Sequence, residues 1–260
     1  MAAIVKQNLY TVKMTAYKIR MSRKPKENKA NRPRSRAVAR PAGAKQAVRR
    51  TRAEKDSPYH HGALRDALLQ AAERVLERDG LPGLTLRAVA REAGVSHAAP
   101  THHFGDLTGL VSELAAIGFQ RFNAALAAAR ATGTHPLEKA LAGAKAYVAY
   151  AQANPGMYGL MFRTERIDMS RPSLHEAADA SFAGLAGAVG ASRDEQIQEQ
   201  ALTLDQAAAI ARAWSLVHGF TILLLDGRLT AILERLPKGT TVETLLHAML
   251  TSTVARPPPR

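Results

Sequence analysis

The stretch from Gly80 to Leu110 reads GLPGLTLRAVAREAGVSHAAPTHHFGDLTGL and decides the fold. Thr85 is placed to cap a short helix, because a threonine hydroxyl can accept a hydrogen bond from a free amide in the first helical turn. The inner face of that helix is predicted to be Leu86, Val89, Ala90 and Ala93. Gly94 then allows a tight turn, and Ser96 is predicted to cap a second short helix that ends near His102–His103.

A longer amphipathic helix precedes these two. From Gly62 onward apolar residues recur every three or four positions, which places them on one face of a helix. They are Leu64, Ala67, Leu68, Ala71, Ala72, Val75 and Leu76. Asp79-Gly80 ends the helix, since glycine readily adopts the left-handed conformation found at helix C-termini. Three helices with a glycine-containing turn between the last two are typical of a helix-turn-helix, here within residues 59–105.

The rest of the chain is predicted to be helical as well. Alanine and leucine dominate, aromatic residues make up 5%, and the pattern contains no series of strands and no internal repeat. Helices are expected at about 106–130, 136–153, 156–164, 173–189, 203–226 and 240–253. Capping pairs indicate helix starts at Ser192, Thr203 and Thr240. The fold class is therefore all-α: an N-terminal three-helix helix-turn-helix domain, followed by a helical bundle domain over residues 106–255.

The excess positive charge lies in the first part of the chain. Residues 1–58 contain 17 Lys and Arg against 3 acidic residues, whereas the remainder contains 19 of each. After Met21 this segment shows no hydrophobic period, so residues 1–58 are predicted to be a disordered basic arm. Such an arm either contacts a polyanion such as nucleic acid or is a solvated extension.

The second short helix carries side chains suited to reading DNA. A helix that enters the major groove needs small or polar residues there, and this one offers His97, Ala98, Ala99, Thr101 and His102. Phe104 is predicted to anchor the helix in the core. Free amides at the helix starts near Thr85 and Ser96 suit phosphate groups. The histidines at 97, 102 and 103 form no i, i+4 pair and have no assisting acid, so no metal site is expected.

This ordered set of residues resembles the TetR family of bacterial regulators over residues 60–120. The matching elements are Thr-Leu-Arg at 85–87, the apolar helix that follows, Gly-Val-Ser at 94–96 and Phe104. The resemblance implies that the second short helix is the recognition helix and that Arg87 points at a DNA base or phosphate. A solvated arginine is the simpler alternative for Arg87.

The recognition helix also departs from the family pattern. The family usually has Tyr in place of Thr101 and a basic residue in place of Leu107, and both are phosphate contacts. We expect His102, His103 or the basic arm to substitute for them. Pro100 lacks an amide hydrogen and restricts the residue before it, so the first turn of the helix is predicted to be shifted or strained.

Two further segments resemble the C-terminal domain of a TetR subgroup that is named for its Trp-His-Gly residues. They are ANPGMYGLMF at 153–162 and WSLVHGF at 214–220. Core packing alone would explain their apolar residues, which recur at helical spacing. The resemblance implies a ligand cavity, and methionine suits an adaptable apolar pocket. The candidate ligand-binding residues are Met157, Tyr158, Met161, Phe162, Trp214 and His218.

The last two long helices are candidates for a dimer interface. Two recognition helices must reach successive major grooves, about 34–36 Å apart, so the mechanism requires a homodimer. A four-helix bundle built from residues 203–226 and 240–253 of two copies is predicted to bury Leu223, Leu224, Leu245, Leu246 and Met249. The longest nearly apolar stretch, Ala213–Leu225, is too short to cross a bilayer, so no membrane association is expected.

These observations predict a DNA-binding transcriptional regulator. The resemblance implies a repressor that binds a double-stranded DNA operator and is released by a small-molecule effector, with no cofactor. The absence of cysteine fits a reducing cytoplasm. One alternative is a non-specific nucleic-acid-binding protein that acts through the basic arm. A helical enzyme is the other, but the sequence shows no nucleophile–base arrangement, glycine-rich phosphate loop or metal-ligand pair, so no enzymatic activity is expected.

Overall fold

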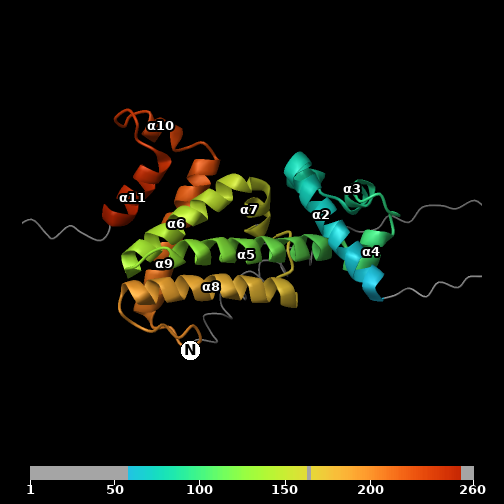
Figure 1. The fold of residues 1–260 in the computed structure, drawn as a ribbon, viewed down its shortest axis with the longest axis horizontal. Helices are drawn as coiled ribbons and strands as arrows, with labels where there is room; N and C mark the ends of the chain where they lie inside the picture. The colour runs from blue at the N-terminus through green and yellow to red at the C-terminus, as the bar shows by residue number, and fades with distance from the viewer. Residues whose placement is uncertain (1–57, 163–164, 253–260) are drawn as a thin grey trace, which may run out of the picture. The chain divides into compact units, whose positions relative to one another are not determined.

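The computed structural model describes residues 58–162 and 165–252, so the predicted basic arm lies outside the described residues except for its last position. Within these ranges all regular structure is helical (Figure 1), which confirms the predicted fold class. The helices are α2 (Pro58–Gly83), α3 (Leu86–Glu92), α4 (Ala99–Phe104), α5 (Leu107–Ala131), α6 (Pro136–Ala153), α7 (Pro155–Met161), α8 (Pro172–Ser192), α9 (Leu204–Leu225), α10 (Thr230–Leu233) and α11 (Val242–Ser252).

Helices α2, α3 and α4 form the predicted helix-turn-helix unit, called the reading head below. Gly80 interrupts α2 with a φ of 68° and a ψ of −178°, which is the predicted break. Thr85 caps α3 as predicted, since its hydroxyl oxygen accepts the Ala88 amide at 3.1 Å. Gly94, with a φ of 68°, turns the chain toward α4. Local signals in the sequence therefore determine most boundaries in the reading head.

The start of α4 differs from the prediction. Ser96 does not cap this helix: α4 begins at Ala99, with Ala98 as its N-cap and no side-chain cap. The Ser96 carbonyl instead accepts the Ala99 amide at 3.0 Å, in a turn that precedes the helix. The reason is Pro100, which fits the first helical turn because its fixed φ is helical and no partner is needed for its nitrogen. The first turn is therefore shifted along the chain.

Helix α5 joins the reading head to the C-terminal domain, which comprises α5 to α11. Asp106 caps α5, its Oδ1 accepting the Gly109 amide at 2.7 Å. Helices α6, α7 and α8 all pack against α5 (Figure 1). One cluster of buried side chains extends from Val75 and Phe104 in the reading head to Leu114 in α5 and onward into the C-terminal domain. The two parts therefore share a continuous core through α5.

The later helix starts test the other predicted caps. Thr203 caps α9 in a full capping box with Gln206, as predicted. Ser192 starts no helix; it is the last residue of α8, and its hydroxyl donates to a carbonyl of that helix. The cap of α11 is Thr241 and not Thr240, because the Thr240 hydroxyl donates to the carbonyl of the preceding proline turn. The short helix α10 is not among the predicted helices.

Helix α9 is longer than the apolar stretch considered in the sequence. By length and composition alone it could cross a membrane. It packs on α6 and α8 through a buried side that carries Ala209, Ile210, Phe220 and Thr221. A helix of a globular domain meets the same criterion, so α9 is weak evidence for a membrane span. Its other side leaves Ile222 and Leu223 exposed.

Candidate DNA interface and effector site

The predicted DNA-contacting residues lie on the accessible parts of α3, α4 and the turn between them. Thr85 and Arg87 are exposed at the start of α3. In the turn and in α4 the exposed residues are Ser96, His97, Ala98, Thr101 and His102, while Ala99 and His103 are half-buried. Pro100 and Phe104, four residues apart, form the buried side of α4. The helix thus presents small and polar groups outward while its other side is anchored in the core.

Ion pairs hold α3 on α2. Glu92 accepts hydrogen bonds from Arg74 Nε at 2.8 Å and from Arg78 Nη1 at 2.9 Å. Both bonds lower the pKa of the Glu92 carboxyl, and the bond from Arg74 has the larger effect. Because all three side chains are partly in solvent, the pairs orient α3 more than they stabilise the fold.

Three side chains from three helices meet inside the C-terminal domain. The side-chain polar atoms of Tyr147 of α6, Tyr158 of α7 and His218 of α9 lie within hydrogen-bonding distance of one another. These three residues are called the polar cluster below. The Tyr147 and Tyr158 hydroxyl oxygens lie 2.8 Å and 2.9 Å from His218 Nδ1, and 3.1 Å from each other. Two hydroxyl donors fit a neutral imidazole with Nδ1 as the acceptor, which leaves the Nε2–H as a donor. Among the described residues, none accepts a hydrogen bond from Nε2.

Aromatic rings surround the polar cluster. Phe122 lies edge-on to Tyr147 with 4.9 Å between ring centroids, and Phe162 lies 4.8 Å from the His218 ring. The Trp214 ring is 6.1 Å from that of His218. Burial raises the pKa of both tyrosines, that of Tyr147 to about 12, and lowers the pKa of the histidine. All three groups are therefore uncharged at neutral pH.

The predicted ligand-binding residues only partly meet at this cluster. Those that do are Tyr158, Phe162, Trp214 and His218. Met157 and Met161 instead pack on α5 at Gly118, where an added Cβ would lie 2.8 Å from the Met157 sulfur and 3.0 Å from the Met161 Cγ. The two methionines therefore fill the contact between α7 and α5.

Two cavities lie away from the polar cluster. One, of 230 Å³, lies between α2 and the junction of α6 and α7, next to Leu76 and Asn154. The other, of 200 Å³, is lined by Leu84 and Val111 and by the exposed chain at Glu165. Neither is lined by a residue of the polar cluster. Within residues 58–162 and 165–252, no three His, Asp or Glu side chains are grouped as metal ligands.

The predicted dimer residues do not all face outward. Leu246 of α11 is 1% exposed and packs with Val148 and Phe220 of the same chain, so its predicted place in a dimer interface is wrong. Leu224, Leu245 and Met249 pack partly against the same cluster. Leu223 is 42% exposed, as a contact with a second copy requires.

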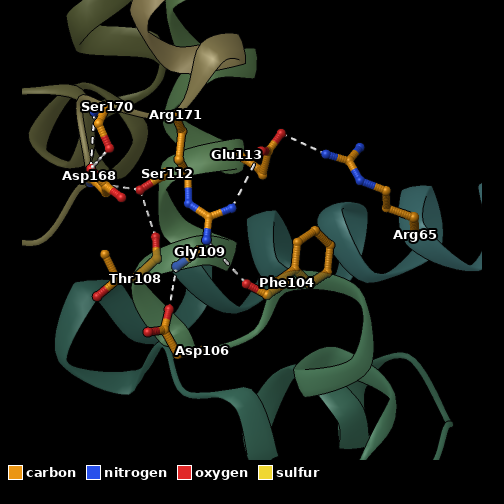
Figure 2. Close-up of polar contacts among 10 residues, drawn as sticks. All are labelled: Arg65, Phe104, Asp106, Thr108, Gly109, Ser112, Glu113, Asp168, Ser170 and Arg171. Carbon is orange, nitrogen blue, oxygen red and sulfur yellow. Dashed lines mark hydrogen bonds and ion pairs between the residues drawn. The ribbon is translucent and has the colours of Figure 1, made fainter.

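Sequence reasoning missed two sets of residues that the structure brings together. Tyr147 makes two of the three contacts in the polar cluster, and its only signal was a pair of tyrosines three residues apart in an alanine-rich helix. Arg65, Glu113 and Arg171 meet beside the end of α4 (Figure 2), although they come from three distant parts of the chain.

Comparisons with known proteins agree with this geometry. Residues 68–114 match the family described as "Bacterial regulatory proteins, tetR family", and residues 140–251 match "Tetracyclin repressor-like, C-terminal domain". A structure of a protein of unknown function from Rhodococcus sp. RHA1 is 35% identical, with a TM-score of 0.59 over 76% of this chain and 96% of that one. A comparison with curated proteins gives no match.

More distant structures share the fold. The transcriptional regulator FadR from Bacillus subtilis, solved with stearoyl-CoA, is 14% identical, with a TM-score of 0.54 over 73% of this chain and 97% of that one. The fatty acid degradation regulator FadR from Bacillus halodurans is also 14% identical, with a TM-score of 0.52 over 80% of this chain and 100% of that one.

The fold and the exposed recognition helix define a helix-turn-helix DNA-binding protein with a helical C-terminal domain. The chain belongs to the TetR family of bacterial regulatory proteins, which are DNA-binding transcriptional regulators. The family resemblance predicted from the sequence is therefore confirmed.

Proposed function

We propose that the protein is a homodimeric repressor that binds a roughly palindromic operator through α3 and α4 and is released by a small-molecule effector. The observation that carries the proposal is the outer side of α4, where exposed Ala98, Thr101 and His102 stand opposite the buried Pro100 and Phe104. Short side chains let the helix backbone approach the base edges in the major groove. The predicted contacts at the start of α3 and in the turn are proposed to bind phosphates.

The exposed side of α9 supports a dimer. It combines the small residues Ala208, Ala211 and Ser215 with the exposed apolar side chains of Ile222 and Leu223. Small residues let two helices approach closely, and apolar ones gain from leaving water. The same side of α9 on two copies would form an isologous interface around a two-fold axis, which matches a palindromic operator.

The polar cluster is the proposed effector site. His218 Nε2–H lacks an acceptor among the described residues, and aromatic rings lie around it. A ligand with an apolar body and a carbonyl or carboxylate oxygen would satisfy that donor. The FadR structure from Bacillus subtilis, whose fold this chain shares, is a complex with stearoyl-CoA, which supports ligand binding by a protein of this fold. The effector acts by binding the released conformation more tightly than the DNA-bound one.

Selection of bound duplexes from a random DNA pool by the full chain tests the function. We expect a palindromic motif, bound at least ~10³-fold more tightly than random DNA. Arg87→Ala should weaken binding to that motif by about 10-fold. The matched control is Arg228→Ala, which removes an exposed arginine between α9 and α10.

The alternative of a non-specific basic arm predicts a different result. Binding through the arm alone would enrich no motif, would show a steep dependence on salt, and would be insensitive to Arg87→Ala. That outcome would reject the operator-binding proposal.

A further inference from the structure

We propose that Arg171 is a positioning residue that ties the end of the recognition helix to the C-terminal domain, and that its release transmits the effector signal to the reading head. The inference rests on the proposed function, because it names how the same DNA-reading site is regulated. It concerns the Arg171 network, which comprises Arg65, Phe104, Glu113 and Arg171 (Figure 2).

The contacts of Arg171 reach the end of α4. Arg171 is the N-cap residue of α8, and its Nη2 donates to the carbonyl oxygen of Phe104, the last residue of α4, at 3.4 Å. A positive charge at the C-terminal end of a helix is favourable, because the last carbonyls are otherwise unpaired. Nη1 of the same guanidinium lies 3.9 Å from Glu113 Oε1 on α5.

Glu113 links Arg171, which contacts the Phe104 carbonyl, to Arg65, which contacts the Phe104 ring. Its Oε2 accepts from Arg65 Nη2 at 2.6 Å, and the Arg65 guanidinium lies 5.5 Å from the centre of the Phe104 ring. Arg65 belongs to α2, Glu113 to α5 and Arg171 to the start of α8. The residue that anchors α4 is thus held by its ring from α2 and by its carbonyl from α8, with one carboxylate between the two arginines (Figure 2).

Gly109 makes this approach possible. A Cβ at this position of α5 would overlap the Phe104 carbonyl oxygen and would lie 2.5 Å from Arg171 Nη2. No other residue would leave room for the guanidinium and the carbonyl together. The close approach is therefore built into α5 at a position remote in sequence from Arg171.

The segment before Arg171 connects the network to the proposed effector site. Residues 165–171 lie between α7, which carries Tyr158, and α8. The Asp168 amide donates to Ser112 Oγ at 2.8 Å, and that hydroxyl donates to the Thr108 carbonyl at 2.6 Å (Figure 2). Ile167 is 7% exposed and belongs to the main core. Residues 167 and 168 are therefore held on α5, and in the proposal a ligand releases Arg171 by moving α5 and this segment relative to α4.

The hydrogen-bonding groups of the Arg171 guanidinium are incompletely paired, which suits a contact that has to be released. Arg171 Nε is buried and has no hydrogen-bond partner among the described residues, and both contacts of the Nη atoms are long. A buried donor without an acceptor costs free energy in this arrangement, since release of the side chain would expose the donor to water. The contacts of Arg171 are therefore weak for a half-buried arginine, and the proposal needs only a modest difference in ligand affinity to release them.

Hydrogen–deuterium exchange of the full chain, without DNA or ligand, tests the contact itself. We expect Arg171→Ala to raise exchange at the last amides of α4, including His102 and Gly105, by about 10-fold, with no change in α9. Glu113→Gln keeps the side-chain shape, removes the shared charge and should give a smaller increase at the same amides. The control is Arg166→Ala, an exposed arginine in the same segment. Unchanged exchange at the end of α4 in both test variants would overturn the proposal.

DNA binding tests the consequence. With the duplex enriched by the wild-type protein, we expect Arg171→Ala to weaken binding by about 10-fold while the salt dependence is unchanged, because Arg171 does not neutralise a phosphate. Faster exchange with unchanged affinity, or a reduced salt dependence, would overturn its role as a positioning residue. If the pool yields no motif, the proposed function fails, whereas the exchange measurement still decides whether Arg171 holds α4.

Discussion

The reading head and helix α9 differ in where they place their large apolar side chains. In the head, Val75, Val89 and Phe104 are at most 3% exposed, and polar groups remain on the outside. On α9, Ile222 is 38% and Leu223 is 42% exposed, although the helix is among the most apolar in the chain. The head is complete within one chain together with the start of α5, whereas α9 has an apolar side that one chain leaves uncovered.

The difference fits the proposed uses of the two parts. A surface that reads DNA must stay polar and must keep its shape before DNA arrives, so its core is finished in the free protein. A surface that binds a second copy gains its stability from the partner and stays apolar. The following substitutions test this difference.

Phe104→Ala should have the largest effect, because it removes the anchor of α4 from a site that is 3% exposed. Loss of a buried phenylalanine costs about 3–5 kcal/mol, so the free energy of unfolding should fall by that amount. Urea denaturation followed by circular dichroism measures it. A loss below about 1 kcal/mol would mean that α4 is held by other contacts.

Leu223→Glu tests the exposed apolar side of α9. A buried charge in the centre of a dimer interface is expected to raise the dimer dissociation constant by about 100-fold, or ~3 kcal/mol, while the fold of each chain is retained. Sedimentation equilibrium measures the change. The control is Leu137→Glu on α6, where the leucine is 51% exposed and outside the proposed interface. Equal dissociation constants for the two variants would exclude this side of α9 as the interface.

The polar cluster predicts a non-additive pair. Tyr147→Phe and Tyr158→Phe should each lower the free energy of unfolding by about 1 kcal/mol, since the other hydroxyl still donates to His218 Nδ1. The double variant should cost more than the sum, because Nδ1 then has no donor. A double-mutant cycle from urea denaturation gives the coupling, and a strictly additive result would contradict the shared donation to Nδ1.

The two predicted helix caps of the reading head, Thr85 and Ser96, provide a smaller, matched test. Thr85→Ala removes an observed cap and should cost about 1 kcal/mol. Ser96→Ala should leave stability within about 0.5 kcal/mol of wild type, because Ser96 caps no helix. Thermal denaturation of both variants distinguishes them, and an equal loss would restore the sequence-based assignment of Ser96.

The smallest effect concerns pH. Burial lowers the pKa of His218 below its usual 6.5, so the unfolded chain binds a proton that the folded chain does not as the pH falls from 6.5 toward the folded value. Stability should therefore decrease in this window. His218→Asn should reduce the decrease measured by urea denaturation between about pH 7.5 and about pH 5.5. The same pH dependence in both proteins would show that other groups cause it.

Features set by neighbouring residues could be predicted from the sequence. The Gly80 break, the Thr85 cap and the Thr203 capping box each depend on a few adjacent residues, and the structure confirms all three. The caps predicted at Ser192 and Ser96 were wrong. A serine that could cap a helix has no effect where the residues after it favour a helix start at another position. A proline at position 100 moved one of these starts.

Contacts between distant helices could not be predicted. Tyr147 and His218 are separated by 71 positions, and Arg171 and Phe104 by 67. Helical periodicity assigns a residue to a face of its own helix, but it does not specify the residue opposite on another helix. The family resemblance located Trp214 and His218 as a pair of interest, while the tyrosines and arginines that complete their surroundings required the three-dimensional fold.

Trp214 gives the protein a built-in optical reporter. It is the single tryptophan of the chain, is 43% exposed on α9 and lies 6.1 Å from His218 in ring-to-ring distance. All tryptophan emission therefore comes from one position, between the polar cluster and the apolar side of α9. Association of two chains should shift that emission to shorter wavelength as water leaves the indole, and ligands that reach His218 should quench it. Candidate effectors can thus be screened by titration in a cuvette, without labels and before the operator sequence has been determined.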